Sequence, residues 1–598
     1  MGSVMRSWIV FAWLGGTLSP AFAQQITLVS ATSSGVQGNG DSGAFGHFSL
    51  SADARFVAFD SVASNFFAND TNGQLDVFVR DLATGSLECV SLTPSGGAGA
   101  WGANTPSISA DGRFVTFESL SSNLVANDTN NVTDVFVRDR QLGTTECVSV
   151  STNGVLGNSW SGWSSISADG RFIAFESMAS NLVAGDTNSH LDIFVRDRLL
   201  STTERMSVTS GGAQASSNNY YPVLSADGRV VAFESQSWDL IPNDTNSFAD
   251  VFVHDRVSGL TELAALNSLG AQANFNSGDS GIALSGDGRF VAFGTWATNL
   301  VPNDTNSESD VFLRDRLEGA TSRASVDSTG AQADLQTSQP SLSADGRFVA
   351  FSGLASNLVA GDTNGVSDVF VRDLLLGTTT RVNLAPGGVQ ANGSSGAPTL
   401  SPDGRWVVFS SLASNLVAND NNLHTDVFLL DRGAPAGTTF CSGEGNSGPC
   451  PCGNFGSLGR GCTNSAATGG ALLGASGVPS LASDTLALTC MAELPSVSSL
   501  FLQGDAATAG TGFGDGLRCA GGHLKRLYVH SASGGTVSAP AAGDLAVSLR
   551  SAALGDVLAP GATRYYQVYY RDPDSAYCPS PQGNDSNVSS GVAVVWGQ

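Results

Sequence analysis

Short apolar runs separated by polar turns recur along most of the chain. In one representative stretch the runs cover residues 105–110, 113–119, 134–140 and 145–151. Runs of this length, bounded by Gly, Asn and Asp, are typical of β-strands. In the third run Val135, Phe136 and Val137 are all apolar, so both faces of that strand are expected to be buried. The pattern predicts four-stranded units that pack against neighbours on both sides.

The four-run unit repeats with a nearly constant period. Its clearest marker is the segment 70–81, Asp-Thr-Asn-Gly-Gln-Leu-Asp-Val-Phe-Val-Arg-Asp. The copies are spaced 58, 58, 58, 60, 58 and 58 residues apart and start at Asp70, Asp128, Asp186, Asp244, Asp304, Asp362 and Asp420. So regular a period indicates one supersecondary unit copied in tandem. Seven such units arranged about an axis predict an all-β protein with a seven-bladed β-propeller.

An Asp-Gly pair separates the first two runs in six of the seven units. In the stretch above it is Asp111-Gly112. The equivalent pairs begin at Asp169, Asp227, Asp287, Asp345 and Asp403. Both residue types tolerate positive φ, so the pair predicts a tight two-residue hairpin.

Two motifs of the unit resemble those of a known family. The run 400–409, Leu-Ser-Pro-Asp-Gly-Arg-Trp-Val-Val-Phe, and Ser-Ala-Asp-Gly-Arg versions such as 109–113 resemble the WD40-like, or TolB-like, propeller repeat. The Asp-Val-Phe-Val-Arg-Asp runs resemble its third strand. The resemblance covers roughly residues 25–433, and it departs from the family in the Ser-Asn-Leu-Val-x-x-Asp-Thr-Asn insertion between second and third strands. The family includes transport accessory proteins, peptidase propellers and polysaccharide lyases, so the resemblance does not fix a function.

The last unit lacks a fourth strand, and the beginning of the chain resembles one. The seventh third strand, 426–431, runs directly into Gly433-Ala434-Pro435. Residues 26–30, Ile-Thr-Leu-Val-Ser, match the fourth-strand run 147–150. We therefore expect the N-terminal strand to complete the last blade, which removes an exposed sheet edge.

The chain divides into three predicted parts. Residues 1–23 are predicted to be a cleaved signal peptide, because Arg6 precedes a short apolar run and Ala21-Phe22-Ala23 is a small-x-small cleavage site. Residues 24–433 are the predicted propeller. From residue 434 the period ends and seven cysteines appear, which predicts a small Cys-containing β-sandwich-like domain over 434–598. Seven cysteines allow three disulfides with one left over, and their connectivity stays open.

The charge and hydropathy of the chain narrow its location and partners. The 53 acidic and 28 basic residues give a net charge of −25. That charge repels phosphate backbones and anionic membranes, so a nucleic-acid partner is not expected and cations are the favoured small partners. No later segment is apolar enough to span a membrane. The protein is expected to be exported, either periplasmic or extracellular.

The Asp-x-Asn-x-x-x-Asp part of each marker is the main chemical candidate. Carboxylates and amides that alternate in a short loop can surround a Ca²⁺ ion, which takes six to eight oxygen ligands. The candidate ligands are Asp70, Asn72, Asp76, Asp128, Asn130, Asp134, Asp186, Asn188, Asp192, Asp244, Asn246, Asp250, Asp304, Asn306, Asp310, Asp362, Asn364, Asp368, Asp420, Asn422 and Asp426. Glu308 adds a carboxylate and makes the fifth loop the first choice. Asp81 is excluded, because it lies about 16 Å from Asp76 along a strand.

A structural interpretation of the same loops is open. The first Asp and the Asn can make side-chain turns that satisfy loop amides, and the second Asp can cap a strand. The arginine before the final Asp, such as Arg80 and Arg138, is expected to pair with carboxylates of the neighbouring blade.

Other reactive residues form no catalytic constellation. Two segments resemble the nucleophile sequence of serine proteases: Gly40-Asp41-Ser42-Gly43 and Gly278-Asp279-Ser280-Gly281. Both are assigned to the same position of the repeat. No histidine is arranged to complete a catalytic triad with either of them. The six histidines form no close pair, which disfavours zinc. Cys89 and Cys147 are expected to be solvent-facing thiols on outer strands, because equivalent positions hold Arg205, Arg323 and Arg381.

The sequence favours a binding protein over an enzyme, with no cofactor required beyond a candidate Ca²⁺. The expectation is an exported, non-enzymatic binding or scaffold propeller. Two alternatives are open: a calcium-stabilised adhesin-like or carbohydrate-binding protein, and a polysaccharide lyase or hydrolase. Loop aromatics beside carboxylates would suit a carbohydrate surface, or they pack the loops; they are Trp101, Trp160, Trp163, Tyr220, Tyr221, Trp238 and Trp296.

Overall fold

The computed structural model describes most of the chain after the predicted signal peptide. The described residues are 25–43, 46, 48–68, 70, 72–433, 438–440, 450, 461–462, 464–465, 470–476, 479–482, 484–513, 516–572 and 586–597. The predicted signal peptide, residues 1–23, lies outside them.

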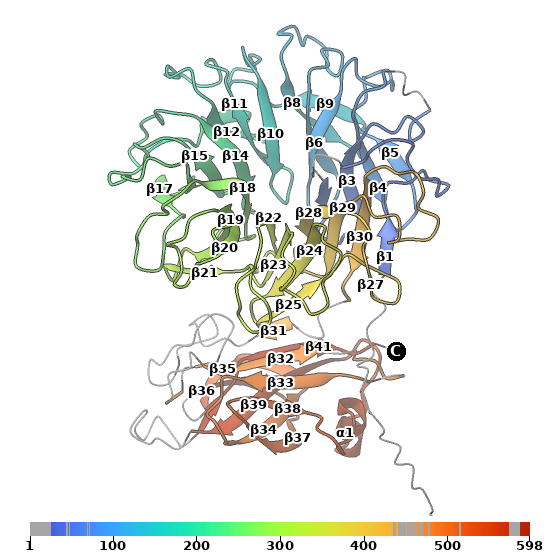
Figure 1. Ribbon diagram of the computed structural model, residues 1–598, viewed down its shortest axis with the longest axis vertical. Coiled ribbons are helices and arrows are strands. Elements are labelled where there is room, and N and C mark those ends of the chain that lie inside the picture. Colours follow the sequence, from blue (N-terminus) through green and yellow to red (C-terminus); the bar gives the residue numbers. More distant parts are fainter. Residues whose placement is uncertain are drawn as a thin grey trace, which may run out of the picture.

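Seven four-stranded antiparallel sheets form a ring (Figure 1). Blade 1 contains β2 (Phe48–Leu50), β3 (Phe56–Ser61), β4 (Asp76–Asp81) and β5 (Leu87–Cys89). Blade 2 contains β6 (Ala103–Ile108), β7 (Phe114–Ser119), β8 (Asp134–Asp139) and β9 (Thr144–Cys147). Blade 3 contains β10 (Ser161–Ile166), β11 (Phe172–Ser177), β12 (Asp192–Asp197) and β13 (Thr202–Arg205). Blade 4 contains β14 (Asn219–Leu224), β15 (Val230–Ser235), β16 (Asp250–Asp255) and β17 (Leu260–Leu263).

The remaining blades follow the same order. Blade 5 contains β18 (Ser277–Leu284), β19 (Phe290–Thr295), β20 (Asp310–Asp315) and β21 (Ala320–Arg323). Blade 6 contains β22 (Thr337–Leu342), β23 (Phe348–Gly353), β24 (Asp368–Asp373) and β25 (Thr378–Arg381), and it is followed by the hairpin β26 (Leu384–Ala385) and β27 (Val389–Gln390). Blade 7 contains β28 (Ser395–Leu400), β29 (Trp406–Ser411) and β30 (Asp426–Asp431), with β1 (Gln25–Leu28) as its outer strand. The predicted seven-bladed propeller is confirmed.

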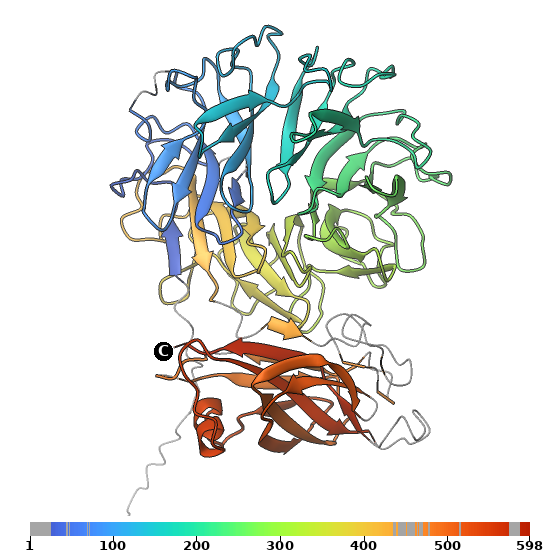
Figure 2. The same ribbon diagram turned by 180° about the vertical axis from the view of Figure 1, so that it is seen from behind.

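The N-terminal strand closes the ring as predicted. Strand β1 pairs antiparallel with β30, with Thr27 opposite Leu429. Beyond the strand, the Ser30 hydroxyl donates to Asp426 over 2.5 Å, and Val29 is fully buried. In Figure 2 the blue strand lies beside the orange strand of the last blade. The two ends of the propeller sequence are therefore joined by a strand ladder and by a buried side-chain contact.

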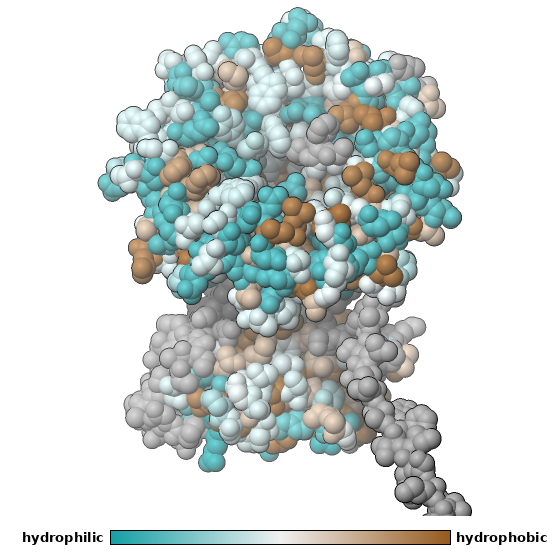
Figure 3. Space-filling model, viewed as in Figure 1, coloured by the Kyte–Doolittle hydropathy of each residue, from teal (hydrophilic) through white to brown (hydrophobic). Residues whose placement is uncertain are grey.

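Both faces of the middle strands are buried, as the apolar runs predicted. In blade 2 the rings of Phe117 and Phe136 stack with centroids 5.8 Å apart, and both side chains are fully buried. The same pair recurs in other blades, for example Phe351 with Phe370 at 5.7 Å. Burying side chains of this size contributes about 2 to 3 kcal/mol each to folding. The exposed apolar side chains on the visible face lie scattered among polar ones (Figure 3).

The Asp-Gly turn differs from the predicted two-residue hairpin. The Gly112 amide donates to the Ser109 carbonyl, and the Ser109 hydroxyl donates to Asp111, so the turn spans 109–112. Only Gly112 has a positive φ, of 72°. A Cβ there would lie 2.2 Å from the ring of Phe56 in the preceding blade. Glycine at this position satisfies two requirements at once: it adopts the positive φ, and it leaves room for the ring of the neighbouring blade.

Arginines connect the strands in a different way from the prediction. Arg80 does not pair with a neighbouring carboxylate but donates to the carbonyls of Ala31 and Thr32. The cross-blade ion pair is made by the arginine after the final Asp, as in Arg140 with Glu88 at 3.0 Å. The strand-end Asp instead binds the arginine of the turn between the first and second strands in all seven blades; this turn reads Asp-Gly-Arg in blades 2 to 7 and Asp-Ala-Arg in blade 1. The pairs are Arg55–Asp81, Arg113–Asp139, Arg171–Asp197, Arg229–Asp255, Arg289–Asp315, Arg347–Asp373 and Arg405–Asp431.

The chain after the propeller forms two packed sheets, which confirms the predicted β-sandwich-like architecture. The larger sheet contains β31 (Thr438–Phe440), β41 (Gly591–Val595), β39 (Thr563–Arg571), β34 (Ser498–Gly504), β37 (Lys525–Ser531) and β40 (Ser586–Val588). The smaller contains β32 (Leu472–Ser476), β33 (Ala487–Met491) and β38 (Val537–Ala539), and the hairpin β35 (Ala506–Phe513) and β36 (Gly516–Gly521) and helix α1 (Val547–Ala553) complete the region. Leu473 and Leu488 of one sheet share a core with Phe501 and Tyr566 of the other.

The cysteines of this region are partly paired. Cys450 and Cys462 form a disulfide, and Cys519 is also disulfide-bonded, whereas Cys490 is a buried free thiol. Disulfides persist in oxidising compartments, which agrees with the expectation of export. Among the described residues, no helix has the length and apolar character of a membrane span.

Candidate functional site

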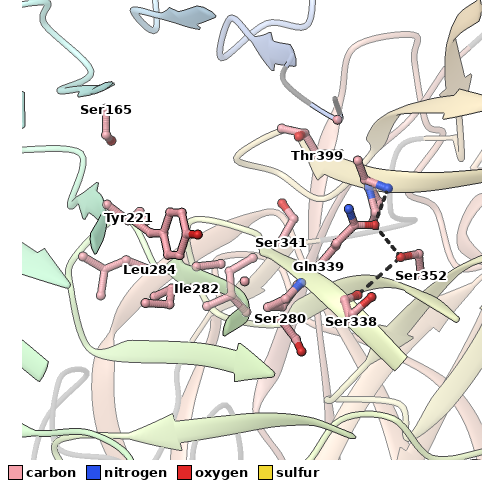
Figure 4. A pocket seen from close by; sticks show the side chains of 18 of the residues that line it. Ser165, Tyr221, Ser280, Ile282, Leu284, Ser338, Gln339, Ser341, Ser352 and Thr399 are labelled. Atoms are coloured by element: carbon pink, nitrogen blue, oxygen red, sulfur yellow. Dashed lines mark hydrogen bonds between the residues drawn. The ribbon is translucent and has the colours of Figure 1, made fainter. Parts of the chain in front are cut away.

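The inner strands of all seven blades surround an axial pocket of about 960 Å³. Figure 4 shows part of its wall, with Tyr221 and Ser165 on one side and Gln339 and Thr399 on the other. Most lining side chains carry hydroxyl, amide or apolar groups. Asp279 is the one charged side chain among the described lining residues. The pocket is therefore suited to an uncharged ligand that is rich in hydrogen-bonding groups.

Each inner strand presents a left-handed residue to this pocket. Blades 2, 3, 4, 6 and 7 place a non-glycine residue there with φ of 48° to 55°; these are Thr105, Trp163, Tyr221, Gln339 and Ala397. Each lies at a shift in the register of the inner strand, which is a β-bulge. A non-glycine residue in this conformation costs about 1 to 3 kcal/mol and is characteristic of functional sites.

Buried carboxyl groups support the wall on one side only. The second strands of blades 1 to 4 carry Asp60, Glu118, Glu176 and Glu234 at equivalent positions, all less than 9% exposed. Blades 5 to 7 carry Gly294, Ser352 and Ser410 there. The sevenfold repeat is therefore broken at the pocket, where one arc is acidic and the other is neutral.

Two of these carboxyl groups hold the strained residues of the next blade. The Trp163 amide donates to Glu118 and the Tyr221 amide donates to Glu176, each over 2.8 Å. Burial raises the pKa of Glu176 to about 8, so near neutral pH much of this carboxyl is protonated. The group therefore supports the pocket wall without placing a full negative charge behind it.

Glu234 has a different partner, because the fifth inner strand is longer than the others. Strand β18 has eight residues where its equivalents in blades 2 to 4, 6 and 7 have six, and the extra residues bring Asp279 to the pocket. Burial, together with the charge of the nearby Asp279, raises the pKa of Glu234 to about 8. One Glu234 oxygen, Oε2, is buried without a hydrogen-bond partner.

Aromatic rings lie next to this acidic arc. The rings of Trp163 and Tyr221 meet edge to face with centroids 4.9 Å apart, and Tyr220 lies 5.9 Å from Tyr221. Trp296 lines the same pocket and is 39% exposed. By contrast, Trp101 and Trp238 are more than half exposed and lie outside the pocket lining. The structure thus divides the predicted aromatic set into a pocket group and a surface group.

The predicted Asp-x-Asn-x-x-x-Asp residues lie together in every blade, at the entry to the third strand. The asparagine accepts the amide two residues ahead, as Asn72 does from Gln74 over 2.9 Å, and the same contact is made by Asn130, Asn188, Asn246, Asn306, Asn364 and Asn422. This is the side-chain turn of the structural interpretation. The second Asp begins the third strand and accepts from the fourth-strand segment, as Asp76 does from Ser91 over 2.6 Å. Burial raises the pKa of Asp76 to about 6.

Three of the loops contain a counter-ion that the sequence analysis missed. In blade 3 Arg205 lies 3.7 Å from Asp186 and 3.4 Å from Asp192. In blade 5 Arg323 makes the equivalent contacts with Asp304 and Asp310, and in blade 6 Arg381 makes them with Asp362 and Asp368. The fifth loop, which Glu308 made the first choice for an ion, is thus among those with an arginine.

The other four blades hold no arginine at this position. It is occupied by Cys89, Cys147, Leu263 and Leu28 in blades 1, 2, 4 and 7. Cys89 and Cys147 are free thiols as expected, but the predicted solvent-facing position is wrong for Cys89, which is 8% exposed. The outer strand turns this side chain toward Asp70 and Asp76, whose charges raise its pKa in addition to the effect of burial.

The remaining candidates separate in space. Ser42 bridges to Ser61 as Ser277 does to Thr295, so Gly40–Gly43 and Gly278–Gly281 are offset by three residues and do not share a repeat position. No group of three or more His, Cys, Asp or Glu side chains is placed to hold a metal within the described part of the chain. The seven Asp-x-Asn-x-x-x-Asp loops, called the rim loops below, each offer two carboxylates. An ion bound there would therefore also need carbonyl oxygens or water as ligands.

The sequence contained one signal for the asymmetric pocket. The single 60-residue spacing, between Asp244 and Asp304, corresponds to the two extra residues of β18. The proximity of Asp279 to Glu234 could not be derived from that spacing, because it depends on how neighbouring blades pack.

Comparison with known proteins gives similarities of fold. No protein-family model matches the sequence, and no curated protein matches it. Solved structures similar to this chain include an oligogalacturonate lyase from Vibrio parahaemolyticus, with 11% identity, a TM-score of 0.41, and coverage of 69% of this chain and 97% of that one. TolB from Acinetobacter baumannii is 12% identical, with a TM-score of 0.30 and coverage of 63% of this chain and 80% of that one. Kuenenia stuttgartiensis hydrazine synthase is 15% identical, with a TM-score of 0.35 and coverage of 70% of this chain and 98% of that one.

Proposed function

We propose that this protein is an exported, non-enzymatic binding protein whose axial pocket takes a neutral saccharide. The observation that carries the proposal is the broken symmetry of the pocket wall. Buried carboxyl groups lie behind the wall in blades 1 to 4 and aromatic rings line it in blades 3 to 5, whereas short hydroxyl and amide side chains face them from blades 6 and 7. A wall that served only to close the ring would have no reason to differ between blades.

The chemistry of the lining favours a sugar over other ligands. Aromatic side chains offer flat apolar surfaces to the C–H faces of a sugar ring. Ser280, Ser341, Gln339 and Thr399 can exchange hydrogen bonds with its hydroxyl groups. No lysine or arginine belongs to the described lining, so a uronic acid or a phosphate would find no counter-charge.

Calorimetric titration with neutral and acidic oligosaccharides tests the proposal. We expect heat from a neutral sugar, and Trp163→Ala should weaken its binding at least about tenfold because one stacking surface is lost. Trp238→Ala, which removes a ring 68% exposed outside the pocket, is the matched control and should bind normally. Binding of acidic sugars alone, or equal losses in both variants, would contradict the proposal.

One observation favours the enzymatic alternative, a saccharide hydrolase or lyase. Glu234 and Asp279 lie near each other at the pocket, and the raised pKa of Glu234 is typical of a carboxyl that acts as a general acid or base. Reducing-end and unsaturated-product assays on the sugars that bind would distinguish the two functions. Turnover that Asp279→Asn abolishes would assign an enzyme in place of a binding protein.

A further inference from the structure

We propose that the aspartate pairs of blades 1, 2 and 4 each bind a Ca²⁺ ion, and that an arginine occupies the equivalent position in blades 3, 5 and 6. This inference concerns the rim loops and is independent of the saccharide proposal. It divides the seven sequence-predicted loops into two classes by the residue on the outer strand.

The arginine blades define the position of the positive charge. In blade 6 a single nitrogen, Nη1 of Arg381, lies 2.9 Å from Asp362 Oδ1 and 3.0 Å from Asp368 Oδ2. Its side chain is only 7% exposed. One cationic atom therefore contacts both carboxylates, in a space closed from solvent. A buried anion pair of this kind requires such a counter-charge.

Blade 1 has the same two carboxylates without that charge. Cys89 lies opposite Phe78 in the register where Arg381 lies opposite Phe370. Asp70 Oδ1 and Asp76 Oδ2, the oxygens that correspond to the two arginine contacts of blade 6, are buried without a hydrogen-bond partner. Asp76 is 1% exposed. Leaving such groups unpaired costs several kcal/mol, and a bound cation would remove that cost.

Blades 2 and 4 share only part of this arrangement, because Oδ2 of Asp134 and of Asp250 accepts from the loop asparagine and only the first aspartate has an unpartnered oxygen at the ion position. Cys147 and Leu263 stand at the arginine position, and Oδ1 of Asp128 and of Asp244 is buried without a partner. Asp128 is 9% exposed. Blade 7 also lacks the arginine, but no buried oxygen of its aspartate pair is without a partner: Ser30 and Asn422 donate to the two oxygens of Asp426. It is therefore excluded from the proposal.

The available ligands indicate Ca²⁺ among divalent cations. Carboxylate oxygens are hard donors, and Ca²⁺ accepts irregular shells completed by carbonyl oxygens and water. The loop asparagines are assigned a positioning role, because Asn130 and Asn246 already donate to Asp134 and Asp250. With two carboxylates each, the sites should have dissociation constants of about 10⁻⁴ to 10⁻³ M, as in extracellular modules.

The test uses the full-length mature protein after removal of metal with a chelator. Calorimetric titration with CaCl₂ and metal analysis after equilibrium dialysis should give three Ca²⁺ per chain. Cys89→Arg, Cys147→Arg and Leu263→Arg introduce the residue of the other blades, and each should lower the count by one. Cys89→Ser retains the size of the side chain without adding charge, and should bind three.

Several results would overturn the proposal. One is no Ca²⁺ bound up to 10 mM, roughly ten times the weakest expected dissociation constant. Another is an unchanged count in the triple arginine variant, provided that its circular dichroism spectrum matches the parent. Tighter binding of Zn²⁺ than of Ca²⁺, abolished by Cys89→Ser, would assign a thiol-ligated metal and would contradict the carboxylate site.

Discussion

The strand-end arginine–aspartate pairs and the axial pocket are built from the same repeat, yet the seven copies agree closely at the pairs and differ at the pocket. At the end of the third strand, the arginine of the turn between the first and second strands binds the strand-end aspartate in all seven blades. At the pocket, four blades carry a buried carboxyl group on the second strand and three do not. Contacts shared by every blade maintain the fold, whereas contacts confined to a few blades are candidates for function.

The largest expected effect is on ring closure, which both regions require. Deleting residues 24–36 removes β1 and the fully buried Val29, and it exposes the edge of β30. We expect the free energy of unfolding to fall by roughly 5 kcal/mol or more, from lost apolar burial and lost strand pairing. Urea denaturation measures this loss, and a synthetic peptide of residues 24–36 should restore part of it. An unchanged midpoint would show that the strand does not close the ring.

The next effect tests whether the repeat glycines act through blade packing. In Gly228→Ala the new Cβ would lie 2.3 Å from the Phe172 ring at a backbone φ of 68°. Overpacking and backbone strain together should cost about 3 kcal/mol. Gly185→Ala is the matched control, because φ is 77° there and no atom lies within 4 Å of the new Cβ. It should cost only about 1 kcal/mol, and equal losses in urea denaturation would contradict a packing role.

The buried carboxyl groups behind the pocket should make the free energy of unfolding depend on pH, and the strand-end arginine–aspartate pairs should not contribute to this dependence near neutral pH. The folded-state pKa of Glu176 and of Glu234 is raised to about 8 from 4.5, mainly by burial. Between about pH 4.5 and pH 8 the folded protein therefore binds more protons than the unfolded chain. The stabilisation is fully present below about pH 4.5 and is lost as the pH rises through 8. Each group should contribute about 1.4 kcal/mol to the decline between pH 7 and pH 9.

Glutamine variants separate these contributions. Glu176→Gln and Glu234→Gln should flatten the decline in urea-derived stability between pH 7 and pH 9. Glu204→Gln, which changes a carboxylate 52% exposed on an outer strand, should leave the slope unchanged. A slope that persists in the Glu176→Gln, Glu234→Gln double variant would place the titrating groups elsewhere.

The smallest effect concerns the cross-blade ion pair on the outer surface. Arg140 contacts Glu88 at 3.0 Å, and the Glu88 side chain is 46% exposed. A double-mutant cycle with Arg140→Gln and Glu88→Gln should give a coupling below about 1 kcal/mol, since solvent screens the pair. The coupling should shrink further in 0.5 M NaCl, where the Debye length is about 4 Å. A larger coupling that is insensitive to salt would make this pair a structural contact of the repeat.

The sequence by itself determined the architecture, because a propeller repeats one local pattern. The 58-residue period, the apolar centres of the third strands and the resemblance of residues 26–30 to a fourth strand predicted seven blades closed by the N-terminus. Each of these signals is local in sequence, and the structure confirms all three. The asparagine side-chain turns were foreseen for the same reason, since an Asx turn involves residues only two positions apart.

Only the tertiary structure decided which residues meet across strands and blades. The sequence aligned Cys89 with Arg205, but only the folded strand directs that position toward the aspartate pair and leaves Asp70 and Asp76 without the arginine. The sequence also contained the 60-residue spacing, but only the packing of blades 4 and 5 brings Asp279 near Glu234. Side-chain direction and inter-blade distance depend on the whole ring, so neither charge pairing nor the pocket could be derived from a local pattern.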